Sequence, residues 1–236
     1  MFNRRSFLLG CGLTATGLLG YQPSAAAAAV DLRSCHPADP LKALQQGNAR
    51  FAAAWQASNA AVDADGRTRA MAALWRDNCV LPSSALKTGQ APWASVLCCA
   101  DSRVAPEWIF DAVPSDLFVI RSAGNTAFNE AIASLEYAVS ILKTPLILVM
   151  GHSGCGAVTA ARSSTPLTPL LDELLAPIRA NGPAEQSLDA AIRTNARRSA
   201  EQLTERSALL AEAVEAEAVV IRSAYFDIGS GTVTMI

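Results

Sequence analysis

The segment Ala94-Ser-Val-Leu-Cys-Cys-Ala-Asp-Ser-Arg103 joins a short, largely apolar run to a cluster of polar side chains. Residues 94–99 are apolar enough to form a strand buried on both faces, as strands of parallel sheets are. Because Cys98 and Cys99 are neighbours in this strand, their side chains point to opposite faces. We therefore interpret Cys98 as a small buried hydrophobe. Cys99, the last strand residue, is the one that reaches the crevice at the end of the strand.

The alternation of strand and helix continues along the rest of the chain. Further strands are predicted at residues 117–120, 145–150, 217–227 and 232–236, the last as an edge strand after a Gly-Ser-Gly turn. Helices are predicted at residues 39–58, 67–78, 106–111, 129–142, 155–163, 167–180 and 187–215. This order predicts an α/β fold, with a mostly parallel central sheet flanked by helices and a C-terminal antiparallel edge strand.

A second polar cluster, Gly151-His-Ser-Gly-Cys-Gly156, follows the apolar run at residues 145–150. In a parallel sheet this cluster and the first one meet at the carboxyl ends of their strands, where such sheets bind ligands. Zinc favours thiolate and imidazole ligands, and a catalytic zinc has three protein ligands and one open position. Cys99, His152 and Cys155 supply such a set, so we predict one zinc per chain there. The H-x-x-C spacing alone is a weak signal, which the cysteine on another strand end strengthens.

Asp101 and Arg103 follow Cys99 closely enough to point into the same crevice. A carboxylate there accepts a hydrogen bond from a zinc-bound water or hydroxide, and Arg103 holds that carboxylate by a two-pronged, charge-assisted bond. Without Arg103, Asp101 would be free to occupy the open position on zinc. An isolated Asp-Ser-Arg sequence is most often a surface pair in a turn. Its place beside a metal ligand favours the catalytic interpretation.

These motifs resemble those of the β-class carbonic anhydrases, and in particular exported bacterial members, over about residues 39–236. The resemblance is carried by Val96-Leu-Cys-Cys-Ala-Asp-Ser-Arg-Val104, Pro106-Glu107, Ile109-Phe110, Asp116-Leu-Phe-Val119, Arg121, Ala123-Gly-Asn125, Ser134-Leu-Glu-Tyr-Ala138, Gly151-His-Ser-Gly-Cys-Gly-Ala157, Asn195 and Ala224-Tyr-Phe-Asp-Ile-Gly-Ser-Gly231. The combination of C-x-D-S-R with H-x-x-C is highly specific.

The resemblance implies an enzyme that interconverts carbon dioxide and bicarbonate by zinc-hydroxide attack. It implies that Cys99, His152 and Cys155 bind the zinc and that Asp101 and Arg103 form the orienting pair. Gln90 looks like the family glutamine that reaches across a dimer interface to the substrate, and the family's homodimers often pair into tetramers. Two alternatives stay open. One is a related hydrolase of carbon disulfide or carbonyl sulfide, and the other is a non-catalytic zinc or redox protein.

One subgroup of the family closes its zinc with the aspartate and is inhibited by bicarbonate held in a nearby pocket. That pocket looks to require a Trp three residues before the first cysteine ligand and a Gly immediately before it. Here those positions are Val96 and Cys98. We therefore expect the open form of the site at neutral pH.

Residues 1–29 are typical of an export signal. Paired arginines at Arg4 and Arg5 precede a moderately apolar stretch, and an alanine run at residues 25–29 offers cleavage registers. The Arg-Arg-Ser-Phe-Leu-Leu sequence resembles a twin-arginine signal. The apolar stretch is short and broken by Gly and Thr, so it suits a membrane anchor poorly. We expect residues 30–236 to form a single domain in the periplasm, with no membrane attachment in the mature form.

Composition limits the function further. The chain has 236 residues, of which 51% are hydrophobic, and its net charge of −2 gives no electrostatic case for nucleic acid. Five cysteines remain after residues 1–29, and in an oxidising compartment cysteines tend to pair. A disulfide between Cys35 and Cys79 is compatible with export, but spacing alone does not establish it. His36 is expected to be solvent-exposed.

Overall fold

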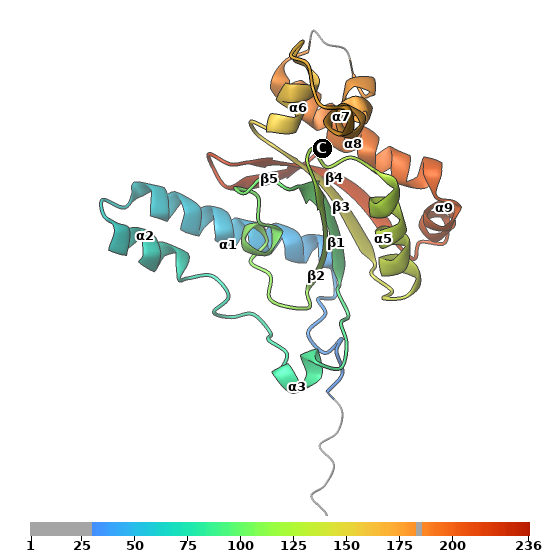
Figure 1. The fold of residues 1–236 in the computed structure, drawn as a ribbon. Coiled ribbons are helices and arrows are strands. Elements are labelled where there is room, and N and C mark those ends of the chain that lie inside the picture. The colour runs from blue at the N-terminus through green and yellow to red at the C-terminus, as the bar shows by residue number, and fades with distance from the viewer. Residues whose placement is uncertain (1–29, 183–185) are drawn as a thin grey trace, which may run out of the picture.

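The computed structural model describes residues 30–182 and 186–236. Within them the strands form one five-stranded sheet with the order β2-β1-β3-β4-β5 (Figure 1). The strands are β1 (Ala94–Cys99), β2 (Leu117–Ser122), β3 (Leu146–His152), β4 (Val220–Asp227) and β5 (Thr232–Met235). The first four pair in parallel, and β5 pairs antiparallel with β4. The predicted fold class is confirmed.

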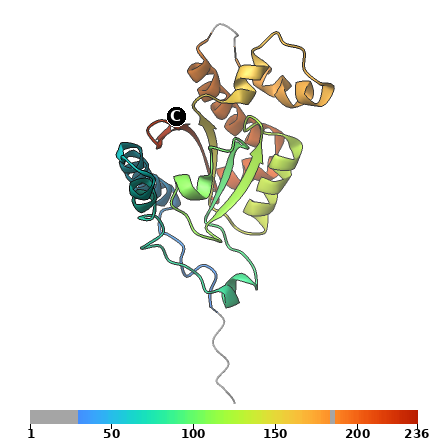
Figure 2. The ribbon, with the colours of Figure 1, turned by 60° about the vertical axis from the view of Figure 1, so that its left-hand side comes forward.

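Helices cover both faces of the sheet, as Figure 2 shows. They are α1 (Pro40–Ala60), α2 (Ala64–Met71), α3 (Ser83–Leu86), α4 (Pro106–Ile109), α5 (Asn129–Ser140), α6 (Gly156–Ala161), α7 (Pro169–Ala180), α8 (Leu188–Arg206) and α9 (Ala208–Glu215). On the α1 face, Cys98 and Leu148 pack with Phe51 of that helix. On the opposite face, Leu97 and Val149 pack against α5 and α9. The two central strands, β1 and β3, are therefore buried on both sides, which explains their apolar sequences.

Most predicted elements differ from the observed ones by one or two residues at an end, and three differ more. The helix expected over residues 67–78 ends at Met71, and Trp75 beyond it takes a left-handed φ of 63°. The helix expected over residues 187–215 is broken at Ser207, whose extended backbone lets its hydroxyl cap α9 by accepting from the Leu210 N–H. The strand expected from residue 217 begins at Val220, because Glu217 has a left-handed φ of 55°.

The N-terminal part of the described chain is tied to the domain. A disulfide joins Cys35 to Cys79, which settles the pairing that the sequence left open. His36 is half-buried, and its Nε2 lies 2.6 Å from the carbonyl oxygen of Ala91, so the expectation of a solvent-exposed histidine is wrong. The predicted export signal at residues 1–29 lies outside the described residues. Among the helices of the described part, none combines the length and apolarity needed to cross a membrane.

Candidate metal centre

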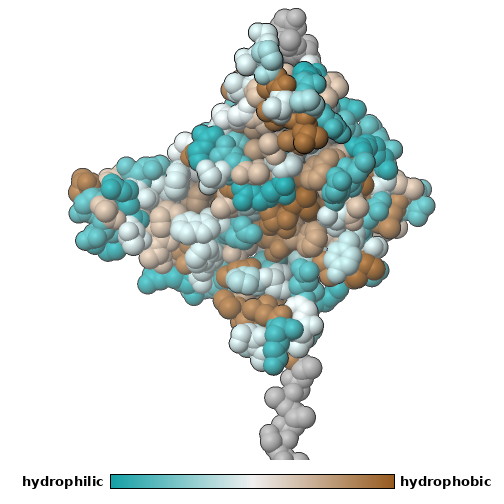
Figure 3. Space-filling view, viewed as in Figure 1, coloured by the Kyte–Doolittle hydropathy of each residue, from teal (hydrophilic) through white to brown (hydrophobic). Residues whose placement is uncertain are grey.

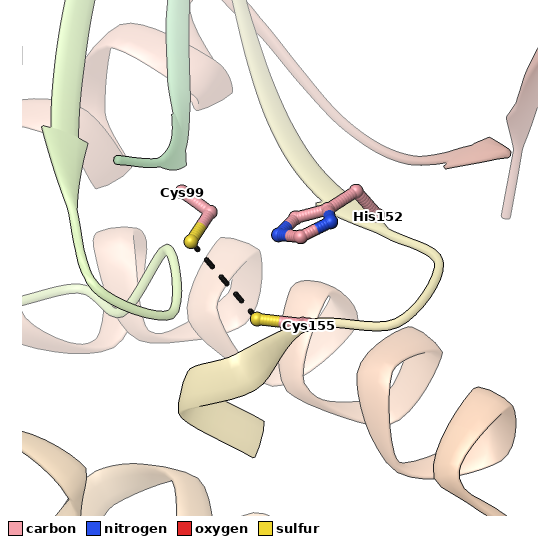
Figure 4. A group of neighbouring side chains, drawn as sticks. All are labelled: Cys99, His152 and Cys155. Carbon is pink, nitrogen blue, oxygen red and sulfur yellow. Dashed lines mark hydrogen bonds between the residues drawn. The ribbon is translucent and has the colours of Figure 1, made fainter. Parts of the chain in front are cut away.

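The three predicted metal ligands come together at one edge of the sheet. Cys99 ends β1, His152 ends β3, and Cys155 is the N-cap of α6. Their side chains point toward one another (Figure 4), and their ligand atoms all lie within 4.8 Å of one another. All three residues are buried, with His152 and Cys155 at 0% exposure. The cluster therefore offers two sulfurs and one imidazole nitrogen in a protected position.

These three residues fit a zinc ion. The sulfurs of Cys99 and Cys155 are 4.0 Å apart and are not joined by a disulfide. Two thiolates bound tetrahedrally at the usual zinc–sulfur distance lie about 3.8 Å apart. His152 Nε2 is buried and has no hydrogen-bond partner among the described residues. An unpaired buried nitrogen is costly unless a ligand satisfies it, so the cluster can hold one zinc.

The backbone around His152 fixes which ring nitrogen faces the cluster. Its Nδ1 lies 3.0 Å from the carbonyl oxygen of Ser153. Because a carbonyl oxygen only accepts, Nδ1 carries the proton and Nε2 is left with a free lone pair. A metal-binding histidine needs this tautomer.

Asp101 and Arg103 lie beside the cluster as the sequence predicts. Arg103 donates from Nε to Asp101 Oδ1 at 2.9 Å and from Nη2 to Asp101 Oδ2 at 2.7 Å. Nη2 also donates to the carbonyl of Gly154, which ties this pair to the loop between His152 and Cys155. The hydrogen bonds from Arg103 hold the pKa of Asp101 well below its usual range. Asp101 Oδ2 lies 3.9 Å from His152 Nε2, close enough to face an occupant of the cluster.

Arg121 and Gly124 support the site, and the sequence alone gave them no role. Arg121 donates to the carbonyl oxygens of Cys99, Asp101 and Val104, so it holds the whole turn after β1. The Gly124 N–H lies 3.4 Å from Cys99 Sγ and donates to it, and Gly124 has a left-handed φ of 96°. A signal for Arg121 was present, since a charged residue ending an apolar strand needs a partner.

Hydrogen bonds and burial shift the pKa values of Cys99 and Cys155 in opposite directions. The hydrogen bond from Cys155 lowers the pKa of Cys99, and the hydrogen bond from the Gly124 N–H acts in the same direction. The pKa of Cys155 moves the opposite way, because that thiol donates to Cys99 and is buried. Both thiols must be deprotonated to bind zinc, so zinc binding would release protons from this pair. Cys98 differs, since burial raises the pKa of its thiol to about 12.

Gln90 lies far from the metal cluster of its own chain. It is exposed in the loop between α3 and β1, at the amino end of that strand, whereas Cys99 is at the carboxyl end. Six strand residues span roughly 17–20 Å. The structure brings together the five other predicted site residues and leaves Gln90 at the opposite edge of the sheet.

Comparison with known proteins identifies the family. A family model described as carbonic anhydrase matches residues 94–233, so the chain belongs to the carbonic anhydrase family. Carbonic anhydrase 2 of Mycobacterium tuberculosis (strain CDC 1551 / Oshkosh) is 40% identical over 126 residues, which are 53% of each chain. Carbonic anhydrase of Mycolicibacterium smegmatis is 40% identical over 129 residues, 55% of this chain and 54% of the relative. The chain thus spans about half the length of the curated relatives that it matches.

Solved structures place the chain in the β class. A tetrameric β-carbonic anhydrase from Sordaria macrospora matches with a TM-score of 0.59 and 26% identity, over 65% of this chain and 85% of that one. The Coccomyxa β-carbonic anhydrase in complex with acetazolamide matches with a TM-score of 0.59 and 26% identity, over 65% of this chain and 75% of that one.

Proposed function

We propose that the protein is a zinc-dependent carbonic anhydrase that reversibly hydrates carbon dioxide to bicarbonate and a proton. The observation that carries the proposal is Asp101, held on Arg103 with its Oδ2 3.9 Å from the metal-facing nitrogen of His152. A purely structural zinc site is closed by four ligands and needs no carboxylate beside it. A redox pair would bring the sulfurs of Cys99 and Cys155, 4.0 Å apart, into a bond.

Each residue of the site has a defined task. Zinc bound by Cys99, His152 and Cys155 would lower the pKa of a coordinated water to about 7 and so supply a nucleophile at neutral pH. Asp101 Oδ2 would accept a hydrogen bond from that nucleophile and orient it toward the carbon of the substrate. Arg103 keeps Asp101 ionised and, by holding both carboxylate oxygens, would keep the carboxylate from binding the metal directly.

The test is CO2 hydration by the purified protein, followed by stopped flow with zinc quantified per chain. We expect activity in proportion to zinc, with a limit of one zinc per chain. The same samples should be assayed with carbon disulfide and carbonyl sulfide, because a related hydrolase would have the same metal site. Hydrolysis of either compound without CO2 hydration would replace the proposal, and zinc-loaded protein inactive on all three would refute it.

We infer that the active unit is at least a homodimer, in which Gln90 of one copy serves the metal site of the other. Gln90 is at the wrong end of β1 to reach its own site, so a second copy is needed if it contacts substrate. β2 is the outer strand of the sheet, and apolar side chains gather on the surface over it (Figure 3). Nearby, Tyr137 and Ile141 are 46% and 63% exposed. A tetramer would pair two such dimers.

We propose that the enzyme is exported by the twin-arginine route and works in the periplasm. Arg4 and Arg5 support the route, and the Cys35–Cys79 disulfide supports an oxidising compartment. Export of a folded, zinc-loaded protein would protect the thiols of Cys99 and Cys155 from oxidation. Changing both arginines to lysine should leave precursor in the cytoplasm, whereas an unchanged periplasmic yield would indicate another route.

A further inference from the structure

The loop that carries Gln90 is held on both sides by the segment at residues 31–36. On one side, Leu32 packs against Gly89, where an added methyl group would lie 3.4 Å from Leu32 Cδ1. On the other, His36 Nε2 lies 2.6 Å from the carbonyl oxygen of Ala91. Since that oxygen only accepts, the His36 ring donates from Nε2. The two contacts fall on the residues immediately before and after Gln90.

A covalent bond fixes the position of His36. Its neighbour Cys35 is joined to Cys79, in the connection between α2 and α3. The disulfide therefore ties the backbone next to His36 to a segment 44 residues away in sequence. The disulfide thus adds a covalent tie to the contacts that Leu32, Arg33 and His36 make with the rest of the domain.

The far side of the loop is anchored to the residues just before β2. The Ala91 N–H donates to Ser115 Oγ at 3.4 Å, and the Trp93 N–H donates to the carbonyl of Asp116 at 2.9 Å. Ala91 and Trp93 are both buried, at 6% exposure, whereas Gln90 between these anchors and α3 is exposed. The loop thus presents Gln90 outward from a backbone that is held on both sides.

We propose that His36 is a positioning residue that holds the Gln90 loop in shape, and that the Cys35–Cys79 disulfide holds His36 in place. This proposal rests on the proposed function, in which Gln90 reaches the substrate at the site of a second copy. A glutamine on a loose loop would sample many positions, and productive alignment would be rarer. The disulfide acts on catalysis through His36 and Gln90 and touches neither metal nor substrate.

The first test measures the loop directly. Hydrogen–deuterium exchange of the peptide covering residues 87–93 should be slow in the wild type and faster in His36→Ala and in the Cys35→Ser/Cys79→Ser variant. His36→Gln keeps an N–H donor of similar reach and should restore slow exchange. Arg33→Ala is the matched control, because Arg33 donates from the same segment to the carbonyl of Leu142 instead of to this loop. Unchanged exchange in His36→Ala would overturn the proposal.

The second test asks whether His36 acts through Gln90. His36→Ala should lower kcat/KM for CO2 hydration about fivefold, the worth of one ordinary hydrogen bond, while zinc per chain stays at the wild-type value. In a Gln90→Ala background the same change should have no further effect. An equal loss in both backgrounds would overturn the positioning role. A different pair of results would separate the two proposals. If His36→Ala speeds the exchange of residues 87–93 but the zinc-loaded wild type does not hydrate CO2, the loop contact is supported and the proposed function is refuted.

Discussion

Arg103 donates hydrogen bonds to both carboxylate oxygens of Asp101, from Nε to Oδ1 at 2.9 Å and from Nη2 to Oδ2 at 2.7 Å. The two residues are two positions apart, with Ser102 between them, so the pair forms within a single turn. Its third bond, to the carbonyl of Gly154, connects the turn after β1 to the loop after β3. One arginine therefore sets both the direction of the carboxylate and the spacing of two metal-binding loops.

Arg103→Ala should remove most CO2 hydration while zinc stays bound. The freed carboxylate of Asp101 can turn toward the metal, and the loss of a charge-assisted pair alone corresponds to roughly tenfold or more. The measurement is kcat/KM together with zinc per chain. Arg179→Ala is a suitable control, because Arg179 forms a similar 2.8 Å pair with Asp172 on α7. Near-normal turnover by the Arg103 variant would contradict the proposed role of the pair.

Replacing Cys155 by alanine should abolish zinc binding, whereas the same change at Cys98 should not. Cys155 is a ligand, and zinc per chain should fall below about one tenth of the wild-type value because two ligands cannot hold the ion. Cys98 lies on the α1 face of β1 at 0% exposure, so its loss should cost about 1 kcal/mol of stability and leave the metal. Metal analysis of both proteins decides, and full zinc occupancy in Cys155→Ala would refute the ligand set.

The stabilising effect of the Asp101–Arg103 pair should be constant from pH 8 to pH 5 and decline only in stronger acid. Arg103 lowers the pKa of folded Asp101 below its unfolded value, near 3.9. The contribution is therefore complete above the unfolded pKa and is lost as the pH falls through the folded one. Urea midpoints of the wild type and Asp101→Asn, measured between pH 8 and pH 3.5, should differ by a constant amount down to about pH 5. A difference that shrinks already between pH 8 and pH 6 would count against this assignment.

The sequence predicted the metal site best, because its ligands lie at the ends of two apolar strands. The positions of Cys99, His152 and Cys155 follow from two apolar runs and the rule that parallel strands end at one edge, and the structure brings these residues within 4.8 Å. The contacts of Arg121 with three carbonyls could not be derived, because they depend on how the turn after β1 folds back. His36 was misjudged for a related reason. Its partner, the Ala91 carbonyl, is 55 residues away in sequence, and the Cys35–Cys79 disulfide beside it could not be established from spacing.

If the protein hydrates CO2 as proposed, bicarbonate should not inhibit it sigmoidally, and the zinc-loaded site should stay open near pH 7.5. The bicarbonate pocket of the closed subgroup is expected to need an indole at the position of Val96 and no side chain at the position of Cys98. Here Val96 and Cys98 are both at 0% exposure and pack in the core cluster on the α1 face, so an anion there would meet apolar side chains and find no N–H donor from an indole.

A lost hydrogen bond to a charged group costs roughly 1.5–3 kcal/mol, which weakens binding about tenfold or more. No bound anion then stabilises the closed form, in which Asp101 binds zinc. The two hydrogen bonds from Arg103 to Asp101 therefore favour the open form. The check is initial rate against bicarbonate concentration at pH 7.5, expected to be hyperbolic, alongside a crystal structure of the zinc-loaded protein at the same pH. That structure should show three protein ligands and Asp101 on Arg103, and a carboxylate oxygen of Asp101 bound to zinc would prove the expectation wrong.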